Sequence, residues 1–253
     1  MRLQGQTAVV TGGGRGIGRA IALALAQEGA RVVVNARTPA EVEAVVREID
    51  GMGQQAVGVL ADVTVAAEVD RLVAVSRARF GDIDILINNA GGVPSELYAE
   101  SGALLLDWQV VWDEPEASWE RMLASNLTSV FLCAKAVIPG MIERGHGEIV
   151  TIASQTARVV GRSGGSYAVA KTAALKLTEL LAVQAGKHGI RVNAVSPGTV
   201  ETLGNTRLLQ ARAPGRDLPL RESAETVARA VLYLLCDAPR SMNGQSLDTF
   251  GIG

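Results

Sequence analysis

Three residues with chemically useful side chains, Ser154, Tyr167 and Lys171, are spaced so that they could act on one small molecule. A tyrosine with its ordinary pKa of about 10 is a poor acid or base near neutrality. Lys171 lies one helical turn after Tyr167 on the same face, so its ammonium can stabilise the phenolate and lower that pKa. Ser154 follows a predicted strand and can donate to a carbonyl oxygen. Together they favour reduction of a ketone, which needs a hydride on carbon and a proton on oxygen.

Each of these residues has a simpler interpretation when it is taken alone. Y-x-x-x-K pairs occur by chance on many helices, usually as a solvated lysine beside a half-buried tyrosine, and a lone Ser154 would only cap a loop. Ser154 after a predicted strand, together with Tyr167 and Lys171 on one helical face, favours catalysis over these alternatives.

A glycine-rich turn, TGGGRGIG from Thr11 to Gly18, follows the apolar run Thr7–Val10 and does not fit G-x-G-x-x-G in any register. Between a strand and a helix, such glycines let the backbone approach a pyrophosphate, and the helix N-terminus offers free N–H groups. A Walker A loop is excluded because no Gly-Lys-Ser/Thr closes the motif, whereas an ordinary strand-to-helix turn remains the alternative. The residues expected at a dinucleotide are Gly12, Gly14, Arg15, Gly16, Ile17 and Gly18.

The end of the second predicted strand indicates which dinucleotide the turn would bind. Sites for NAD usually carry an acid there, about 20 residues after the glycines, which bonds the ribose 2′-hydroxyl. This strand instead ends in Asn35, Ala36 and Arg37, with no acid at Ala36. Arg37 and Arg15 could make charge-assisted bonds to a 2′-phosphate, although either alone could be a solvated surface residue. The sequence therefore predicts NADP(H) as the cofactor, with NADPH bound in preference to NADH.

Short β-rich runs alternate with amphipathic stretches along the chain, which predicts right-handed βαβ units. The predicted strands are Thr7–Val10, Arg31–Asn35, Ala56–Leu60, Ile83–Asn88, Glu148–Ile152, Arg191–Val195 and Ser246–Asp248. The predicted helices are Gly18–Glu28, Ala40–Met52, Ala66–Phe80, Trp119–Arg144 and Ser166–His188. We therefore expect an α/β fold, a single doubly wound (Rossmann-type) parallel sheet with helices on both faces, forming one domain over residues 1–253.

The bulk composition narrows the class of protein. Of 253 residues, 48% are hydrophobic, which suits a buried parallel sheet, and a net charge of −2 argues against nucleic-acid binding. No apolar run reaches the ~18 residues of a membrane span, and the first strand leaves no room for a signal peptide, so we expect a cytoplasmic protein without membrane contact. Cys133 and Cys236 lie in apolar stretches without metal or redox spacing, which predicts two buried structural thiols and no metal site.

The motifs occur in the order that is typical of the short-chain dehydrogenase/reductase family, and the chain resembles that family from Thr7 to about Asp248. Each motif is weak alone, but the ordered set is highly specific. The resemblance implies an NADP-preferring enzyme of the carbonyl or ketoacyl reductase type that acts on a small-molecule carbonyl substrate. The motifs are TGGGRGIG, Asp62-Val63, NNAG at Asn88–Gly91, Asn126, Ser154, Tyr167-A-V-A-Lys171 and Pro197-Gly198.

The resemblance also implies roles that spacing leaves open. It implies that Asn126 joins Ser154, Tyr167 and Lys171 as a fourth catalytic residue, relaying protons through Lys171 by way of water. Tyr167 and Lys171 would also contact the cofactor, and the turn Asn88–Gly91 would stabilise the sheet beside it. The other implied cofactor residues are Ala36, Arg37, Asp62 and Val63 (at the adenine), Asn89, Ala90, Gly91, and Pro197, Gly198, Val200 and Thr202 (along the nicotinamide). Gln155 is a candidate substrate residue.

Family members of this length resemble dimers of dimers, which implies a homotetramer paired through the helices Trp119–Arg144 and Ser166–His188. The small residues Ala170, Ala173 and Ala174 fit close helix packing, although burial within the subunit explains them equally well.

Residues 92–118 depart most from the family pattern, because the chain is longer there by on the order of a dozen residues. Leu104, Trp108 and Trp112 recur every four residues and predict an apolar helical stripe. The stripe could form a lid in which Trp108 and Trp112 touch the substrate, or it could pack against this or a neighbouring subunit. Gly92–Glu120 also holds seven acids and no Lys, Arg or His. Residues 199–222 resemble the family's mobile substrate loop.

Three alternative functions compete with a general carbonyl reductase. Gly161-R-Ser163-G-Gly165 matches the hydrolase elbow G-x-S-x-G, but only His188 follows, and a hydrolase would leave the glycine turn unexplained. A non-catalytic NADP-binding sensor or scaffold would not need the four catalytic residues. Reduction of 3-oxoacyl chains on a carrier protein is the third alternative, although the acidic segment would repel an anionic carrier protein. The sequence leaves the substrate, the direction and the stereochemistry open.

Overall fold

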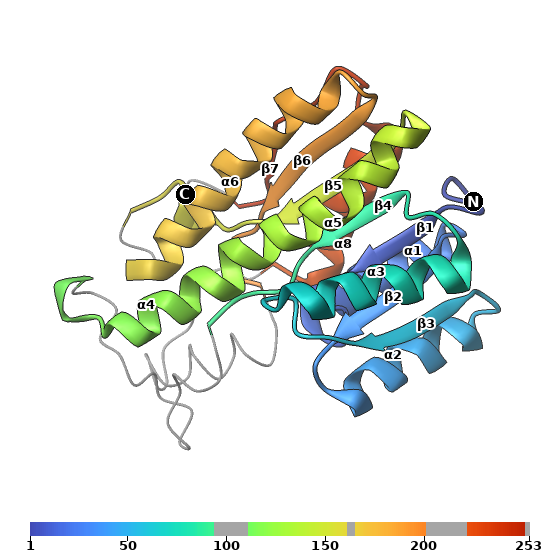
Figure 1. The fold of residues 1–253 in the computed structure, drawn as a ribbon, viewed down its shortest axis with the longest axis horizontal. Helices are drawn as coiled ribbons and strands as arrows, with labels where there is room; N and C mark the ends of the chain where they lie inside the picture. The colour runs from blue at the N-terminus through green and yellow to red at the C-terminus, as the bar shows by residue number, and fades with distance from the viewer. Residues whose placement is uncertain (94–110, 161–164, 201–221, 251–253) are drawn as a thin grey trace.

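The structure of the chain, a computed structural model, describes residues 1–93, 111–160, 165–200 and 222–250. One seven-stranded parallel sheet lies at its centre, in the order β3-β2-β1-β4-β5-β6-β7 (Figure 1). The strands are β1 (Thr7–Val10), β2 (Arg31–Ala36), β3 (Ala56–Leu60), β4 (Ile85–Asn88), β5 (Gly147–Ile152), β6 (Ile190–Ser196) and β7 (Ser246–Asp248). The predicted doubly wound parallel sheet is therefore confirmed.

The helices connect successive strands and cover both faces of the sheet. The α-helices are α1 (Gly16–Gln27), α2 (Pro39–Gly51), α3 (Ala66–Phe80), α4 (Glu116–Leu123), α5 (Ser129–Arg144), α6 (Gly165–Gly186) and α8 (Ala224–Leu232). Short turns complete them: the 3-10 helices η2 (Val111–Asp113) and η4 (Gln155–Ala157), and the π-helices η3 (Ala124–Thr128) and η5 (Tyr233–Asp237).

Side chains of each strand alternate between the two faces, as the pleat requires. Ala8 and Val10 of β1 pack into a core with α1, α2 and α8. Val9 points to the other face, into a core with α3, α5 and α6, which lie in front of the sheet in Figure 1. Because both faces are covered, the strands read in the sequence as nearly continuous apolar runs.

The predicted strands all form, one predicted helix begins earlier than expected, and one helix was not predicted. The helix predicted from Trp119 begins at Glu116 and continues through α4, η3 and α5 to Arg144. The helix α8 was not predicted; the Oγ of Ser223 caps it by accepting a bond from the Thr226 amide (3.2 Å), and its apolar face packs against α1.

The stretch Glu116–Arg144 corrects one expectation drawn from composition. Its 29 residues, with a mean hydropathy of 1.4 in an 18-residue window, make a helix long and apolar enough to cross a membrane. The prediction that no stretch reaches this length is therefore wrong. A buried core helix passes the same test, and α5 lies against β4, β5 and α3 in this fold.

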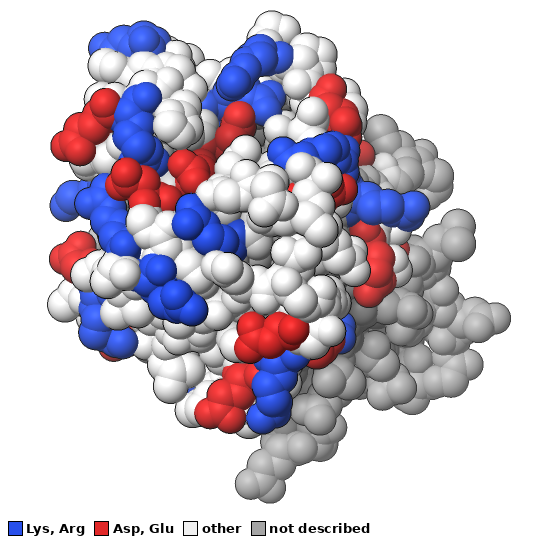
Figure 2. All heavy atoms as spheres, turned by 90° about the vertical axis from the view of Figure 1, so that its right-hand side faces the viewer, with Lys and Arg blue, Asp and Glu red and all other residues white. Residues whose placement is uncertain are grey.

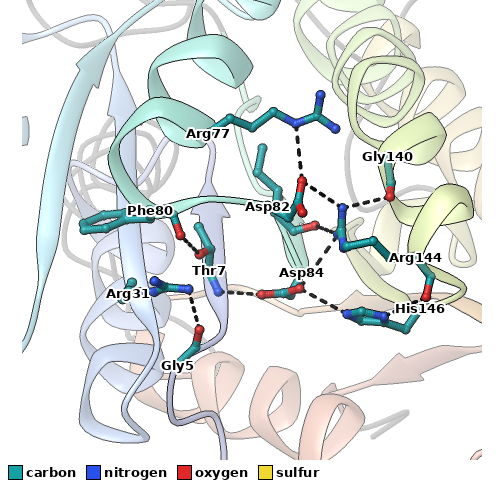
Figure 3. Close-up of polar contacts among 11 residues, drawn as sticks. Gly5, Thr7, Arg31, Arg77, Phe80, Asp82, Asp84, Gly140, Arg144 and His146 are labelled. Carbon is teal, nitrogen blue, oxygen red and sulfur yellow. Dashed lines mark hydrogen bonds and ion pairs between the residues drawn. The ribbon is translucent and has the colours of Figure 1, made fainter.

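A polar network fixes the amino edge of the sheet (Figure 3). Asp84, just before β4, accepts a bond from the backbone nitrogen of Thr7 at 2.9 Å and lies 3.3 Å from Nε2 of His146. Arg144, at the end of α5, donates to the backbone oxygen of Ile83 at 2.7 Å. These contacts join β1, β4 and α5 at the edge opposite the carboxyl ends of the strands.

Charges of both signs are mixed on the face of the molecule seen in Figure 2, which is the right-hand side of Figure 1. Lys and Arg side chains lie beside Asp and Glu side chains there. This face therefore has no extended field of one sign of the kind that attracts a polyanion.

Candidate active site at the carboxyl edge of the sheet

The turns that carry the predicted site residues meet at one edge of the sheet. The glycine turn follows β1, Asn89–Gly91 follows β4, Ser154 follows β5 and Pro197 follows β6, each at the carboxyl end of its strand. The chain builds the sheet outward from β1 in one direction and from β4 in the other. In doubly wound sheets ligands bind outside the carboxyl ends at such a switch point. The arrangement therefore places a ligand between these turns.

The turn after β1 is shaped by glycines that leave no side chain over the start of α1. Gly12 and Gly16 have φ values of 62° and 52°, and a Cβ on Gly18 would overlap the carbonyl oxygen of Gly12. Within the described residues 15–27, α1 starts without a side-chain cap from Arg15 and without an acid in its first turn. Its first N–H groups can therefore bind an anion, and the turn fits the pyrophosphate of a nicotinamide dinucleotide.

Asn89 joins the turn after β4 to the glycine turn. Its Nδ2 donates to the backbone oxygens of Thr11 at 2.9 Å and Gly12 at 3.0 Å. The backbone nitrogens of Asn89 and Ala90 both donate to Oγ1 of Thr11 at 3.0 Å. This network holds the two turns at a fixed separation beside the pyrophosphate position.

Asn88, one residue earlier, has a different environment. Its side chain is buried, and neither its amide nitrogen nor its amide oxygen makes a hydrogen bond to any residue that the structure describes.

The two arginines predicted to meet a 2′-phosphate are both exposed, and each lies beside an acid. Arg15, 72% exposed, has Nη1 at 3.5 Å from Oε1 of Glu41, and Arg37, 64% exposed, has Nη1 at 3.5 Å from Oδ2 of Asp62. A Cβ on Gly14 would lie 3.0 Å from the Cβ of Glu41 and 3.3 Å from that of Ala36. The end of β2 lacks an acid, as predicted. However, the first turn of α2 brings the carboxylate of Glu41 close to Arg15.

Asp62 and Val63 follow β3, where the resemblance implies contacts to the adenine. Val63 is buried in the core between the sheet and α3. The Oδ1 of Asp62 accepts bonds from the Thr64 amide at 2.9 Å and from the Thr64 hydroxyl at 2.7 Å. Burial alone would raise the pKa of Asp62, but these bonds and the charge of Arg37 outweigh it, so the net pKa is lowered. The carboxylate is thus held ionised beside Arg37.

Lys171 has its amine deep inside the protein. Its Nζ donates to the backbone oxygen of Ile152, at the end of β5, at 2.9 Å, and it lies 5.8 Å from the ring centroid of Tyr167. Burial lowers the pKa of Lys171 to about 8, because it disfavours the charged form. A helix therefore brings the two predicted residues together as their spacing indicates, and the end of a strand orients the amine.

Ser154 lies between β5 and η4, and its side chain is buried. Its Oγ accepts bonds from the backbone nitrogen of Thr156 at 3.2 Å and from the Thr156 hydroxyl at 3.0 Å. Both contacts use the oxygen as acceptor, so the hydroxyl proton can be donated to a ligand. Gln155, also buried, donates its backbone nitrogen to Pro197 at 2.8 Å and has Oε1 3.7 Å from a Cβ placed on Gly198. The turns after β5 and β6 are therefore joined.

Asn126 lies in the π-helical turn η3 and is fully buried. Its Oδ1 accepts a bond from the Gly92 nitrogen at 2.7 Å, and its Nδ2 donates to the Gly92 oxygen at 2.9 Å and the Met122 oxygen at 3.1 Å. A Cβ on Gly91 would lie 2.6 Å from Oδ1, so the glycine lets the two segments approach. The side chain is thus used to hold the end of the NNAG turn, and its relay role stays a prediction.

The segment after β6 is fixed by Glu222. Its backbone nitrogen donates to Thr199 at 2.9 Å, its Oε2 accepts from the Thr249 hydroxyl at 2.9 Å, and it forms an isolated β-bridge with buried Val200. Burial raises the pKa of Glu222 more than its hydrogen bonds lower it. Pro197, Gly198 and Val200 therefore lie at the carboxyl edge of the sheet, whereas Thr202 lies outside the described residues.

The apolar stripe predicted for residues 104–112 can be examined only at its last member. Leu104 and Trp108 lie outside the described residues. Trp112 lies in the 3-10 helix η2, and its side chain is 85% exposed. The side chain of Trp112 is therefore not buried, and its contact with a substrate stays a prediction.

The geometry also disfavours the hydrolase alternative. Gly165 begins α6, and His188 follows its end, 22 helical residues later. At 1.5 Å per residue this helix is about 30 Å long, so His188 lies far from Gly165, the described residue of the G-x-S-x-G motif. Ser163 itself is outside the described residues.

Three acids next to the site were not singled out from the sequence: Glu41, Glu114 and Glu222. Glu41 and Glu222 contact predicted site residues and Glu114 contacts the neighbour of one, in each case 22 or more residues away in the chain. Glu114 bonds to Ser166, beside Tyr167. Only a general excess of acids in residues 92–120 pointed toward one of them.

Comparison with known proteins gives consistent matches over nearly the whole chain. A family model described as short chain dehydrogenase matches residues 6–213. The chain is 38% identical over 254 residues to a 3-oxoacyl-[acyl-carrier-protein] reductase of Synechocystis sp., covering 98% of this chain and 97% of that protein. It is 33% identical to 3-oxoacyl-[acyl-carrier-protein] reductase FabG of Escherichia coli, covering 99% and 98%. A solved 7 alpha-hydroxysteroid dehydrogenase complexed with NADH and 7-oxo glycochenodeoxycholic acid is 32% identical, with a TM-score of 0.85 over 100% of this chain and 95% of that one.

Proposed function

The chain belongs to the short-chain dehydrogenase/reductase family of oxidoreductases, and from this premise we propose that it transfers a hydride between NADP(H) and a carbonyl or secondary alcohol. The observation that carries the proposal is the buried amine of Lys171 beside Tyr167. Burying an amine costs free energy, and a scaffold protein gains nothing in return. Ser154 lies at the same edge of the sheet with a hydroxyl proton to donate.

When bound, the nicotinamide supplies or accepts the hydride at the substrate carbon. In the direction of reduction, Ser154 donates a hydrogen bond to the carbonyl oxygen and Tyr167 gives that oxygen its proton. The protonated Lys171 stabilises the phenolate left on Tyr167, which then regains a proton from solvent. With a pKa of about 8, Lys171 remains mostly protonated at pH 7 and can play this part.

Arg15 and Arg37 support the choice of NADP(H). Their guanidinium groups are exposed near the end of β2, where Ala36 leaves room and offers no competing carboxylate. Their ion pairs with Glu41 and Asp62 have N–O distances of 3.5 Å and are exposed to solvent. Exposed ion pairs add little binding free energy, so a 2′-phosphate can compete with these two carboxylates. The related steroid dehydrogenase holds NADH, so family membership leaves this choice to local residues.

The proposal is tested by Tyr167→Phe. This change should remove nearly all NADPH-dependent reduction of activated ketones, while NADPH affinity stays within a few-fold of wild type. The reason is that only the hydroxyl that delivers the proton is lost. A variant that kept substantial turnover would show that another group is the acid.

A more specific candidate is reduction of 3-oxoacyl chains on a carrier protein, which two relatives are named for. The seven acids of residues 92–120 would repel an anionic carrier protein. The test compares one 3-oxoacyl chain on a carrier protein and on a small thioester. A carrier-linked chain turned over many-fold faster would favour this candidate, and a preference for the small thioester would favour the general carbonyl reductase.

We also propose that the protein assembles as a homotetramer. The expected small-residue face does not support this, because Ala170 and Ala174 are buried within the subunit. A different stripe of α6, containing Val169, Leu180 and Val183, is exposed instead, and it supports the proposal.

A further inference from the structure

The beginning of α6 is held by a side chain from a distant part of the chain. The Oε2 atom of Glu114 accepts a bond from the backbone nitrogen of Ser166 at 2.9 Å, and the Ser166 hydroxyl donates to Oε1. Glu114 comes 52 residues before Ser166 in the sequence, and it lies two residues before the start of α4. Ser166 is buried and Glu114 is half-buried, so the contact is shielded from most of the solvent.

The contact meets a physical need of this helix. The first N–H groups of a helix have no partner within it, and they form the positive end of its dipole. A carboxylate that accepts from the first turn satisfies a donor and is attracted by that dipole. Gly165 makes room for it, because a Cβ there would come under 3.0 Å from the Glu114 carboxylate. Gly165 also has a φ of 57°, which glycine adopts without strain.

The contact between Glu114 and Ser166 lies next to the residues proposed to carry the chemistry. Tyr167 is the residue after Ser166, and Lys171 lies one turn further along α6. Helix α4 packs against α6, so Glu114 bridges two neighbouring helices at their N-terminal ends. An error at the first turn would therefore move the phenol relative to the anchored amine of Lys171.

We propose that Glu114 is a positioning residue that fixes the first turn of α6 and thereby the phenol of Tyr167. It acts through two hydrogen bonds to Ser166 and touches neither substrate nor cofactor. The inference rests on the proposed role of Tyr167 as the proton donor. It also links the acid-rich segment Gly92–Glu120, which contains Glu114, to the helix that carries Tyr167 and Lys171.

Three variants of the full-length protein test the proposal. Glu114→Ala removes both acceptors, whereas Glu114→Gln keeps the shape, because its amide can accept from the Ser166 nitrogen and donate to the Ser166 oxygen. Glu120→Gln is the matched control, since Glu120 is an exposed acid of the same segment.

We expect Glu114→Ala to lower kcat about tenfold, with the Kd for NADPH within twofold of wild type, because geometry of proton transfer is lost and cofactor contacts are kept. Glu114→Gln should keep kcat within about threefold, and Glu120→Gln should match wild type. All assays are run well below each melting temperature, so that lost stability does not count as lost activity. An unchanged kcat in Glu114→Ala, or a loss of NADPH affinity in step with kcat, would overturn the proposal.

Hydrogen–deuterium exchange separates this inference from the proposed function. Amides in the first turn of α6 should exchange about tenfold faster in Glu114→Ala than in wild type, whether or not any ketone is reduced. Equal exchange would overturn the inference even if wild type reduces ketones, and an inactive wild type with faster exchange in the variant would overturn only the proposed function. If Glu114→Ala fails to fold, Glu114→Asp, one methylene too short to reach, replaces it with the same expected results.

Discussion

The amine of Lys171 is buried in the fold, and burial disfavours its charged form. The folded pKa is about 8 against an ordinary value of 10.5, so between these values the unfolded chain binds a proton that the folded chain does not. Stability contributed by this group is therefore greatest above pH 10.5 and is lost as the pH falls through 8. In the proposed function this cost has a use, because the protonated amine is the form that would stabilise a phenolate on Tyr167.

Replacement of Lys171 by methionine should remove this pH dependence. Between pH 8 and 10.5, the unfolding free energy of wild type should rise relative to that of Lys171→Met by up to about 3 kcal/mol. Urea unfolding at both pH values measures it. Lys176→Met, which changes an exposed lysine on the same helix, is the control, and it should behave as wild type. Parallel curves for wild type and Lys171→Met would contradict the prediction.

The preference for NADPH over NADH is also expected to depend on a few single residues. Arg15 and Arg37 should make NADPH bind at least about tenfold more tightly than NADH, which corresponds to ~1.4 kcal/mol and is modest for two charge-assisted contacts. Ala36→Asp combined with Arg37→Ala should shift the preference toward NADH, because it adds a ribose acceptor and removes a phosphate donor. Calorimetric titration with both cofactors measures this, and equal affinities in wild type would refute it.

Among the elements, β1, β4 and α5 depend on the network around Asp84 (Figure 3). Asp84→Ala leaves the buried amide of Thr7 without its acceptor and should lower the unfolding free energy by about 2 kcal/mol. Asp82→Ala, which changes an exposed partner of Arg144, should cost under about 1 kcal/mol. Urea unfolding compares them, and NADPH affinity should be the same in both because the site lies at the other edge. Equal losses of stability would show that the Thr7 contact contributes little.

At the scale of the whole molecule, the exposed apolar stripe on α6 carries the prediction of assembly. Leu180 is 51% exposed and Val183 is 80% exposed. Wild type should scatter light as a tetramer at micromolar concentration, and Leu180→Lys with Val183→Lys should give smaller species, because two charges cannot be buried in an apolar contact. Val75→Lys, which changes a partly exposed apolar residue of α3, is the control. A monomeric wild type would end the tetramer proposal.

Sequence alone determined the features that depend on local spacing. The alternation of apolar runs with amphipathic stretches predicted the seven strands and the doubly wound sheet. It could do so because a strand that is buried on both faces is apolar at nearly every position. The predicted strands placed the glycine turn and Ser154 each at the end of a strand, and a four-residue helical spacing paired Tyr167 with Lys171. The ordered motifs were enough for the family, which the comparisons confirm.

Only the tertiary structure decided the contacts between segments far apart in the chain. It placed Glu41 beside Arg15, used the amide of Asn126 to hold Gly92, buried Val63 in the core and left Trp112 in solvent. It also set Glu114 on the first turn of α6. The physical reason is that a carboxylate or amide shows its chemistry in the sequence but not its partner, because the partner is chosen by the packing of whole helices against the sheet.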